Sequence, residues 1–317
     1  MKTSLDTFYK KEEIMSETNS DTGLEESTRS GFVAVVGRPN AGKSTLMNAL
    51  LGEKISMVSQ KANATRKRIN AIIMHKNNQL IFVDTPGLHE KEKMLNQFMM
   101  KEALKAIGDC DVILFMAPIT DSTEEYEKFL TLTTKPHIVL LSKIDHVSNE
   151  KILLKIQEYQ DFQDRFLAII PVSVSKGGIG FESLLDETVK HLPVSPYLYD
   201  PEDLTTEMLR DIYKEFIREA IFDNISDEIP YETDVLIDKV EEGKNLEKIR
   251  ATIVVEKQTQ KGIIIGKGGT AIKRIGRDAR LQIENLIGKK VFLDLFVSVK
   301  KGWTNDKQAL EDIGYKF

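Results

Sequence analysis

Apolar runs alternate with amphipathic stretches between residues 31 and 192. Runs rich in Val, Ile, Leu and Phe predict strands at 32–37, 67–75, 79–84, 111–117, 137–142 and 168–173. Apolar residues at helical spacing predict helices between several of these strands, at 43–51, 94–107, 124–132, 149–160 and 181–191. This alternation predicts a mostly parallel, doubly wound α/β sheet that binds its ligand at the carboxyl ends of the strands.

The pattern changes after residue 201. Apolar positions between Leu209 and Ile221 fall on one helical face, and strands are expected near 231–241 and 248–256. A short helix then leads to a glycine turn at 266–269, a longer helix runs to about 285, and a final strand at 291–299 alternates apolar and polar residues. The order helix, strand, strand, helix, helix, strand predicts a second domain of the α+β class.

These patterns divide the chain into four segments. Residues 1–29 form an acidic leader with too little apolar surface to offset the entropy of ordering, so we expect it to be disordered; a later start at Met15 stays open. Residues 30–192 form the first domain. Residues 193–203 contain three prolines and form a short stiff linker that is expected to separate two cores. Residues 204–317 form the second domain with its C-terminal tail.

Composition narrows the class of protein. A net charge of −5 over 317 residues argues against a chain that binds polyanions over its whole surface. The single cysteine, Cys110, excludes an intrachain disulfide and is expected to be a small buried residue. The five histidines show no metal-ligand spacing, so we expect no zinc site. No apolar run approaches the length of a membrane span, so we expect no membrane-spanning segment, and the first residues lead us to expect no signal segment.

The stretch GRPNAGKS at residues 37–44 fits the phosphate-binding loop G-x-x-x-x-G-K-[ST]. It lies between a predicted buried strand and a predicted helix, as a phosphate cradle requires. Gly37 and Gly42 let backbone N–H groups converge on phosphate oxygens. Lys43 supplies a positive charge for the β and γ phosphates, and the Ser44 hydroxyl is placed to bind Mg²⁺.

Later loops add motifs that read the nucleotide. Asp84-Thr85-Pro86-Gly87 ends a hydrophobic strand, where a carboxylate holds Mg²⁺ through water and a glycine N–H senses the γ-phosphate. Asp145, two residues after Lys143, would accept hydrogen bonds from guanine but would be left unpaired by adenine. We therefore predict a guanine-nucleotide site formed by Gly37, Arg38, Pro39, Asn40, Ala41, Gly42, Lys43, Ser44, Thr45, Asp84, Thr85, Pro86, Gly87, Leu88, Ser142, Lys143, Asp145, Ser173 and Val174.

These motifs resemble those of the Era family of GTPases. The resemblance covers residues 31–317 and rests on GRPNAGKSTLMNAL, ATRKR, DTPGL and SKID, followed by LRDIYKEFIREAIF, EIPYETDV, IIIGKGG, IKRIG, VKKGW and LEDIGY. It implies a P-loop GTPase domain followed by a type II KH domain. It also implies a GTP-hydrolysing factor that binds the 3′ end of small-subunit (16S) ribosomal RNA, assists assembly of the 30S subunit and acts as a monomer. Such a factor is cytoplasmic, with a fraction peripherally associated with the inner membrane.

The resemblance assigns Thr65 as the switch threonine that joins Ser44 on Mg²⁺ when GTP is bound. Leu88 stands where Ras-like enzymes have a water-orienting glutamine, so slow intrinsic hydrolysis is expected. In related GTPases with this feature, an asparagine placed like Asn40 helps to hold K⁺; a local turn role for Asn40 is equally open. The candidate catalytic residues are Asn40, Lys43, Thr65, Asp84 and Gly87.

Three departures from the family pattern lie in the nucleotide motifs. Val174 replaces a small alanine, but its expected role is through the backbone. Asn63 and Ala64 stand where Gln-Thr is more common, next to Thr65. Ser142 replaces the usual asparagine of the guanine motif, and the lost amide is expected to cost about 1 kcal/mol of nucleotide affinity.

Positive charge gathers in the second domain. Residues 248–301 contain thirteen Lys and Arg and four Asp and Glu, a net charge of +9 within an acidic chain. The GKGG turn allows close approach of a single-stranded RNA backbone, and isoleucines 263–265 are expected to form an apolar floor for bases. Trp303 is interpreted as a packing residue rather than a base-stacking one. The candidate RNA-binding residues are Ile265, Gly266, Lys267, Gly268, Gly269, Lys273, Arg274, Arg277 and Arg280.

Two other classes share part of this pattern. An ATP-using P-loop enzyme, such as a small-molecule kinase, would have the same phosphate loop, but Asp145 argues against adenine. A KH regulator with an inactive nucleotide domain would have the same second half, but Lys43, Ser44, Thr65 and Asp84 are all present. Competition between GTP and ATP tests the first alternative, and single-turnover hydrolysis tests the second.

Overall fold

The computed structural model describes residues 27–59, 61, 64–88, 93–175, 177–226 and 228–315, so most of the predicted leader lies outside the described residues. The elements of the first domain lie close to the predicted ranges and follow the predicted order. They are β1 (Ser30–Val36), α2 (Lys43–Leu51), β2 (Ile69–His75), β3 (Asn78–Asp84), α3 (Met94–Asp109), β4 (Val112–Pro118), α4 (Glu124–Leu132), β5 (His137–Ser142), α5 (Asn149–Glu158), β6 (Ala168–Pro171) and α6 (Phe181–Lys190).

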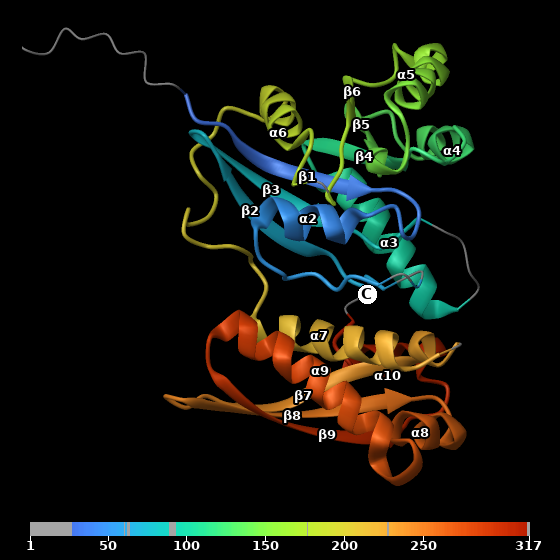
Figure 1. The fold of residues 1–317 in the computed structure, drawn as a ribbon, viewed down its shortest axis with the longest axis vertical. Helices are drawn as coiled ribbons and strands as arrows, with labels where there is room; N and C mark the ends of the chain where they lie inside the picture. Colours follow the sequence, from blue (N-terminus) through green and yellow to red (C-terminus); the bar gives the residue numbers. More distant parts are fainter. Residues whose placement is uncertain are drawn as a thin grey trace, which may run out of the picture.

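The first domain is built around one sheet with helices on both faces (Figure 1). In the described part of the chain the strand order is β2-β3-β1-β4-β5-β6, with β2 antiparallel to β3 and the other pairs parallel. Alternate residues of β1 face opposite sides: Val33 and Val35 share a core with α2 and α6, whereas Ala34 and Val36 share one with α3, α4 and α5. The predicted α/β class is confirmed.

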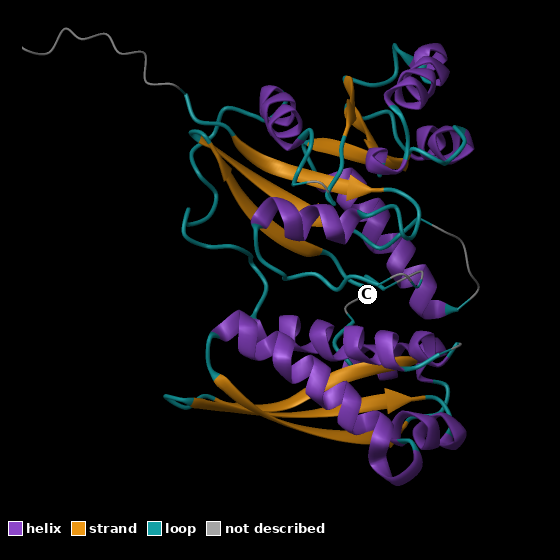
Figure 2. Ribbon diagram, in the orientation of Figure 1, coloured by secondary structure: helices purple, strands orange, loops and turns teal. Residues whose placement is uncertain are grey.

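The second domain packs helices on one face of a smaller sheet (Figures 1 and 2). Strand β8 pairs antiparallel with β7 and parallel with β9, as a type II KH domain requires. The buried stripe of α9, which includes Ala271, Ile275 and Ile283, shares the sheet's core. The elements are α7 (Leu209–Asn224), β7 (Thr233–Glu241), β8 (Leu246–Val255), α8 (Gln258–Ile265), α9 (Thr270–Ile287), β9 (Lys290–Val299) and α10 (Lys307–Asp312). Across the described ranges, no helix is both long and apolar enough to cross a membrane.

The connector runs beside the first sheet rather than standing free. The buried side chain of Gln79 on β3 accepts hydrogen bonds from the backbone of Leu198 and Tyr199 at 2.8 and 3.0 Å, and donates one to the Tyr199 carbonyl at 2.8 Å. On β2, the Ile72 N–H donates to the Leu204 carbonyl at 2.9 Å. These contacts fix the path of the chain into α7.

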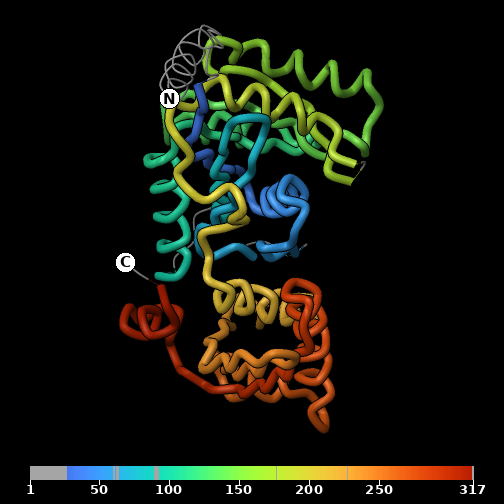
Figure 3. Tube along the Cα trace, turned by 90° about the vertical axis from the view of Figure 1, so that its left-hand side faces the viewer, coloured from blue at the N-terminus to red at the C-terminus, as the bar shows by residue number. Residues whose placement is uncertain are grey.

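The two domains share a core, so the expectation that the linker separates two cores is wrong. Phe98 of α3 packs with Trp303, Leu310 and Tyr315 from the end of the chain. Figure 3 shows this C-terminal segment beside α3. Trp303 is fully buried, and its indole N–H donates to the Glu232 carbonyl at 3.2 Å, which confirms its interpretation as a packing residue.

Candidate nucleotide pocket and RNA groove

The predicted phosphate loop lies between β1 and α2 and lines a cavity of 720 Å³. Lys43 is almost completely buried there, and its ammonium donates to the carbonyl oxygens of Gly37 and Arg38 at 3.1 and 3.0 Å. The pKa of Lys43 is lowered to about 8, because the effect of burial outweighs the opposing effect of the nearby Asp84 carboxylate. A partly desolvated cation at the base of an open cavity is suited to bind phosphate. Other predicted residues that line the cavity are Pro39, Asn40, Gly42, Ser44, Thr45, Thr65, Gly87 and Lys143.

Three oxygen-bearing side chains meet beside Lys43. The Ser44 hydroxyl donates to Asp84 Oδ2 at 2.6 Å and lies 3.0 Å from the Thr65 hydroxyl. Asp84 is fully buried; burial raises its pKa and the bond from Ser44 lowers it. Its other oxygen, Oδ1, has no hydrogen-bond partner among the described residues. Two hydroxyls and a carboxylate with a spare oxygen fit Mg²⁺, which prefers oxygen ligands and retains several waters.

The D-x-x-G segment packs directly against the phosphate loop. A Cβ atom added to Gly87 would lie 2.7 Å from the Pro39 nitrogen, so only glycine fits at this contact. The next backbone N–H, from Leu88, donates to the Gly37 carbonyl at 3.2 Å, and the Leu88 side chain packs against the core that includes Val36. The aliphatic side chain therefore lies against protein and offers nothing to a water molecule.

A second cavity of 270 Å³ lies at the ends of β5 and β6. Asp145 points its carboxylate toward two serine hydroxyls: Ser173 donates at 2.7 Å and Ser175 at 2.5 Å. These bonds lower the pKa of Asp145 to about 2. Ser175 is not among the residues predicted from the sequence; the signal that could have identified it is a second hydroxyl two residues after Ser173, on the loop that follows a strand. The ionised, oriented carboxylate is suited to accept two donors from a base.

The two remaining residues of the guanine motif join that motif to the phosphate loop. The Ser142 hydroxyl donates to the Ala41 carbonyl at 3.0 Å, and the Lys143 ammonium donates to the Asn40 carbonyl at 2.9 Å. Ser142 therefore links β5 to the phosphate loop. The expected loss of nucleotide affinity from the missing asparagine amide is separate from this structural role. Val174 packs against the core, which leaves its backbone as the candidate contact to a base.

Two residues of the phosphate loop, Arg38 and Asn40, have geometries that bear on the roles predicted for them. The Arg38 side chain turns aside and binds Asp121 through two nitrogens, at 2.5 and 2.8 Å. A nucleotide contact from Arg38 would therefore come from its backbone. Asn40 is exposed and adopts a left-handed backbone conformation, with φ of 60°, which asparagine tolerates better than most residues. This conformation supports the turn role and leaves the K⁺ role a prediction.

The second domain forms part of the cavity wall, which the sequence analysis did not predict. Phe222 and Asp223, from the end of α7, line the cavity beside Lys61 and Ala64 of the segment before Thr65. Lys61 also donates to the Phe222 carbonyl. No local signal marks these residues, because their position depends on how α7 packs against the first domain.

Three of the nine predicted RNA-binding residues line a groove of 340 Å³ between α9 and β9. Lys273, Arg277 and Arg280 line one side, with Phe292 and Leu295 opposite. Arg277 is 64 % exposed and contacts Asp278 at 3.0 Å. Figure 1 shows the two elements side by side. Exposed basic side chains next to apolar and aromatic ones suit an unpaired nucleic acid strand.

The glycine turn lies at the N-terminus of α9, at residues 266–269. Gly268 and Gly269 adopt left-handed conformations, and a Cβ added at Gly268 would meet open space. Lys267 is exposed in the turn, and Arg274 is exposed outside the lining of the groove. Ile264 is buried in the core, so this part of the expected isoleucine floor is wrong. Ile263 is half exposed and Ile265 is partly buried, and their role under bases stays a prediction. The apolar residues that line the groove between α9 and β9 include Ile272, Val291, Leu293 and Leu295.

The fold and the two sites define a P-loop guanine-nucleotide protein with a C-terminal KH domain. Residues 32–143 match the family model described as 50S ribosome-binding GTPase, and residues 228–304 match the KH domain model. The chain is 54 % identical to GTPase Era of Campylobacter lari over 288 residues, which cover 90 % of this chain and 99 % of the relative. It is 49 % identical to GTPase Era of Helicobacter pylori, over 91 % of this chain and 97 % of that protein.

Solved structures agree with these relatives. Aquifex aeolicus Era bound to GDP and AlF4⁻ superposes with a TM-score of 0.87 at 34 % identity, covering 91 % of this chain and 100 % of that one. Era in complex with MgGDPNP and nucleotides 1506–1542 of 16S ribosomal RNA superposes with a TM-score of 0.86 at 34 % identity, covering 92 % of this chain and 100 % of that one. The chain belongs to the GTPase Era family.

Proposed function

We propose that this chain is a GTP-hydrolysing switch that binds the 3′ segment of 16S ribosomal RNA and assists assembly of the 30S subunit. One observation carries this proposal. A phosphate cavity, a pocket suited to guanine and a basic groove lie on two domains that share one hydrophobic core among the described residues. A relative was solved with MgGDPNP and 16S ribosomal RNA nucleotides bound together. Asp145 with its two serine donors favours guanine over adenine, which makes an ATP-using enzyme the weaker alternative.

The side chains of the cavity divide the work of phosphate binding. Lys43 exchanges its two carbonyl partners for phosphate oxygens, which restores a full set of charged hydrogen bonds to a buried ammonium. Ser44 and Thr65 would hold Mg²⁺ directly and Asp84 would hold it through water. When bound there, Mg²⁺ would neutralise charge that develops on the phosphates. Gly87 offers a backbone N–H beside Pro39, where a γ-phosphate would lie.

Because Leu88 faces the core and cannot orient the attacking water, we expect hydrolysis to depend on a further positive charge besides Lys43 and Mg²⁺. We assign this role to K⁺ held by Asn40. K⁺ is expected to raise single-turnover GTP hydrolysis about tenfold over Na⁺, and Asn40→Ala should remove the difference. Rates are measured at equal ionic strength, so that general screening by salt does not contribute. Equal rates in the two salts would contradict the assignment.

The RNA proposal is tested on the full chain with an oligonucleotide of the 16S 3′ segment. Gly268→Asp with Gly269→Asp is expected to weaken RNA binding at least about tenfold, because two carboxylates would face the phosphate backbone. GTP affinity should stay unchanged, since the turn does not line the nucleotide cavity. RNA affinity is measured across a salt series, and GTP hydrolysis with and without RNA.

The matched control is Gly268→Asn with Gly269→Asn, which places the same demand on the backbone without the charge. Arg277→Ala should also lower the slope of affinity against salt by about one phosphate contact. Wild-type affinity and slope in the aspartate variant and in Arg277→Ala would place the RNA elsewhere on the chain. An oligonucleotide that changes neither binding nor turnover in the wild type would contradict the proposed partner.

We further propose that the protein acts as a monomer in the cytoplasm, with a fraction held peripherally at the inner membrane. These assignments rest on the family resemblance. Sedimentation of the purified chain, and fractionation of cells with washing of the membranes at high salt, test them.

A further inference from the structure

The switch threonine is bracketed by contacts to the KH domain. On one side, Arg218 of α7 donates to the Ala64 carbonyl at 2.9 Å. On the other, the Arg66 guanidinium crosses into the KH domain. Between them, the Thr65 hydroxyl lies 3.0 Å from the Ser44 hydroxyl in the phosphate loop. Within residues 64–66, the middle residue therefore contacts the phosphate loop, and the residue on each side of it contacts the KH domain.

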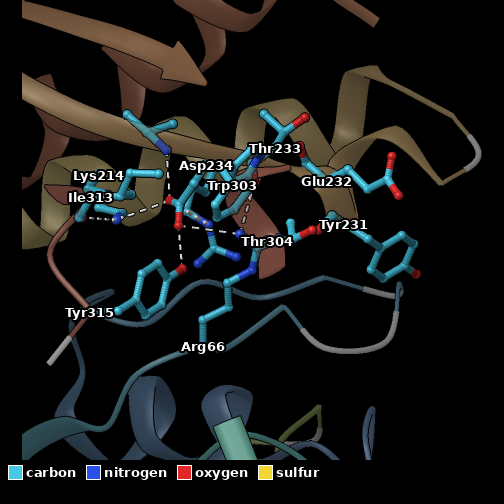
Figure 4. Close-up of polar contacts among 12 residues, drawn as sticks. Arg66, Lys214, Tyr231, Glu232, Thr233, Asp234, Trp303, Thr304, Ile313 and Tyr315 are labelled. Carbon is cyan, nitrogen blue, oxygen red and sulfur yellow. Dashed lines mark hydrogen bonds and ion pairs between the residues drawn. The ribbon is translucent and has the colours of Figure 1, made fainter. Parts of the chain in front are cut away.

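The Arg66 side chain is held from several directions (Figure 4). It donates to the carbonyl oxygens of Thr233 and Tyr231, both at 2.9 Å, and of Pro230 at 3.2 Å. Its guanidinium also lies 5.9 Å from the centre of the Trp303 ring. The side chain is only 3 % exposed, so these bonds replace the water that a free guanidinium would have.

Asp234 gathers the charges of this interface. Its carboxylate lies 3.4 Å from Arg66 and 3.0 Å from Lys214, it accepts from the Tyr315 hydroxyl, and Arg218 lies 3.7 Å away. Burial opposes its ionisation, but the three cations hold the pKa of Asp234 well below its ordinary value. The fixed carboxylate locks Arg66 to α7, β7 and the C-terminal tail as one unit, so any shift of the KH domain displaces Arg66.

We propose that Arg66 is a positioning residue: through it, the KH domain sets the place of Thr65 in the nucleotide cavity. The proposal rests on the proposed function, in which Thr65 serves the GTP-bound state. The position of the KH domain is coupled to that of Thr65 through the backbone. Residues 64 and 66, on either side of Thr65, are bonded to the KH domain, so Thr65 has little freedom to move independently. An RNA-dependent shift at the KH domain would then alter the GTP-bound site without any direct contact between RNA and nucleotide.

Arg68 provides a matched control on the same segment. It binds Glu102 at 3.0 Å and Asp109 at 3.4 Å, both on α3 of the first domain, rather than the KH domain. Arg66→Gln and Arg68→Gln thus remove the same charge two residues apart, and only the first loosens the bracket around Thr65.

The experiment measures affinity for GDP and for the non-hydrolysable analogue GDPNP, both with Mg²⁺, on the full chain. Arg66→Gln is expected to weaken GDPNP binding about tenfold and to slow single-turnover GTP hydrolysis at least as much, with GDP affinity within about twofold of wild type. Arg68→Gln should match wild type in all three. Arg66→Lys keeps the charge with fewer donors and should show the same pattern more weakly; it also serves if the glutamine variant fails to fold.

A double-mutant cycle separates positioning from general support. Thr65→Ala should itself weaken GDPNP binding, and Arg66→Gln should add nothing further in that background if it acts only through Thr65. Emission of Trp303, the single tryptophan, should differ between the GDP and GDPNP states of wild type but not of Thr65→Ala, because Arg66 lies beside the Trp303 ring and reports the position of the segment.

Three results would overturn the proposal: full additivity of the two substitutions, equal loss of GDP and GDPNP affinity in Arg66→Gln, or identical behaviour of Arg66→Gln and Arg68→Gln. Failure of the proposed function gives a different result. In that case wild type would not hydrolyse GTP, or Thr65→Ala would bind GDPNP as wild type does.

Discussion

Replacement of Lys43 by alanine is expected to lower GTP turnover about 10³-fold, or about 4 kcal/mol in transition-state stabilisation. Lys43 is buried beneath the cavity, with its ammonium on the carbonyl oxygens of Gly37 and Arg38. Folding has already buried and positioned this charge before phosphate binds. The attraction between the ammonium and the phosphate then strengthens as negative charge develops on the transferring group. Single-turnover hydrolysis and nucleotide affinity measure the loss.

The fold should survive this substitution. The two carbonyl oxygens that lose the ammonium lie next to the cavity that Lys43 itself lines, so water from the cavity is expected to replace the ammonium. The melting temperature of Lys43→Ala should therefore stay close to that of wild type. Lys128→Ala removes a surface lysine that pairs with Glu125 and serves as the control for charge. Unchanged turnover in Lys43→Ala would contradict the assignment of the phosphate loop.

Replacement of Asp145 by asparagine is expected to lower GTP affinity about 10²-fold, or about 3 kcal/mol, and to favour xanthosine triphosphate. The carboxylate accepts from two donors on guanine, whereas an amide donates to the carbonyl that xanthine presents at the same place. Ser173 and Ser175 already orient the side chain, so the variant should keep its position. Competition among GTP, ATP and xanthosine triphosphate measures the exchange.

Asp186→Asn gives a surface control, since Asp186 contacts His75 and Lys76 at the opposite end of the sheet.

The pKa of Asp145 is held at about 2, so this carboxyl stays ionised at any pH where the protein is handled. The GTP preference of wild type should therefore be flat between about pH 5 and 8 as far as this carboxyl is concerned. A variant that still prefers GTP strongly would exclude Asp145 as the base-reading residue.

The hydrophobic pattern predicted every named strand and helix of the first domain, but not all of its ends. Predicted strand 168–173 stops at Pro171, where the ladder to β5 ends; Ser173 instead pairs with Ile179 in an isolated bridge. Predicted strand 67–75 begins at Ile69, because Lys67 and Arg68 turn to contacts with Gly314 and α3. Side-chain contacts to remote elements set these boundaries, and a local pattern does not contain them.

The sequence by itself determined the α/β and KH folds, the phosphate loop and the basic helix, because each is formed by neighbouring residues whose spacing and chemistry suffice. The tertiary structure decided which remote residues complete the sites. Ser175 meets Asp145 and Phe222 walls the nucleotide cavity only once separate loops and domains have packed. Arg66 and Asp234 stand 168 residues apart, and their contact exists only because the two domains bury charge together at a shared surface.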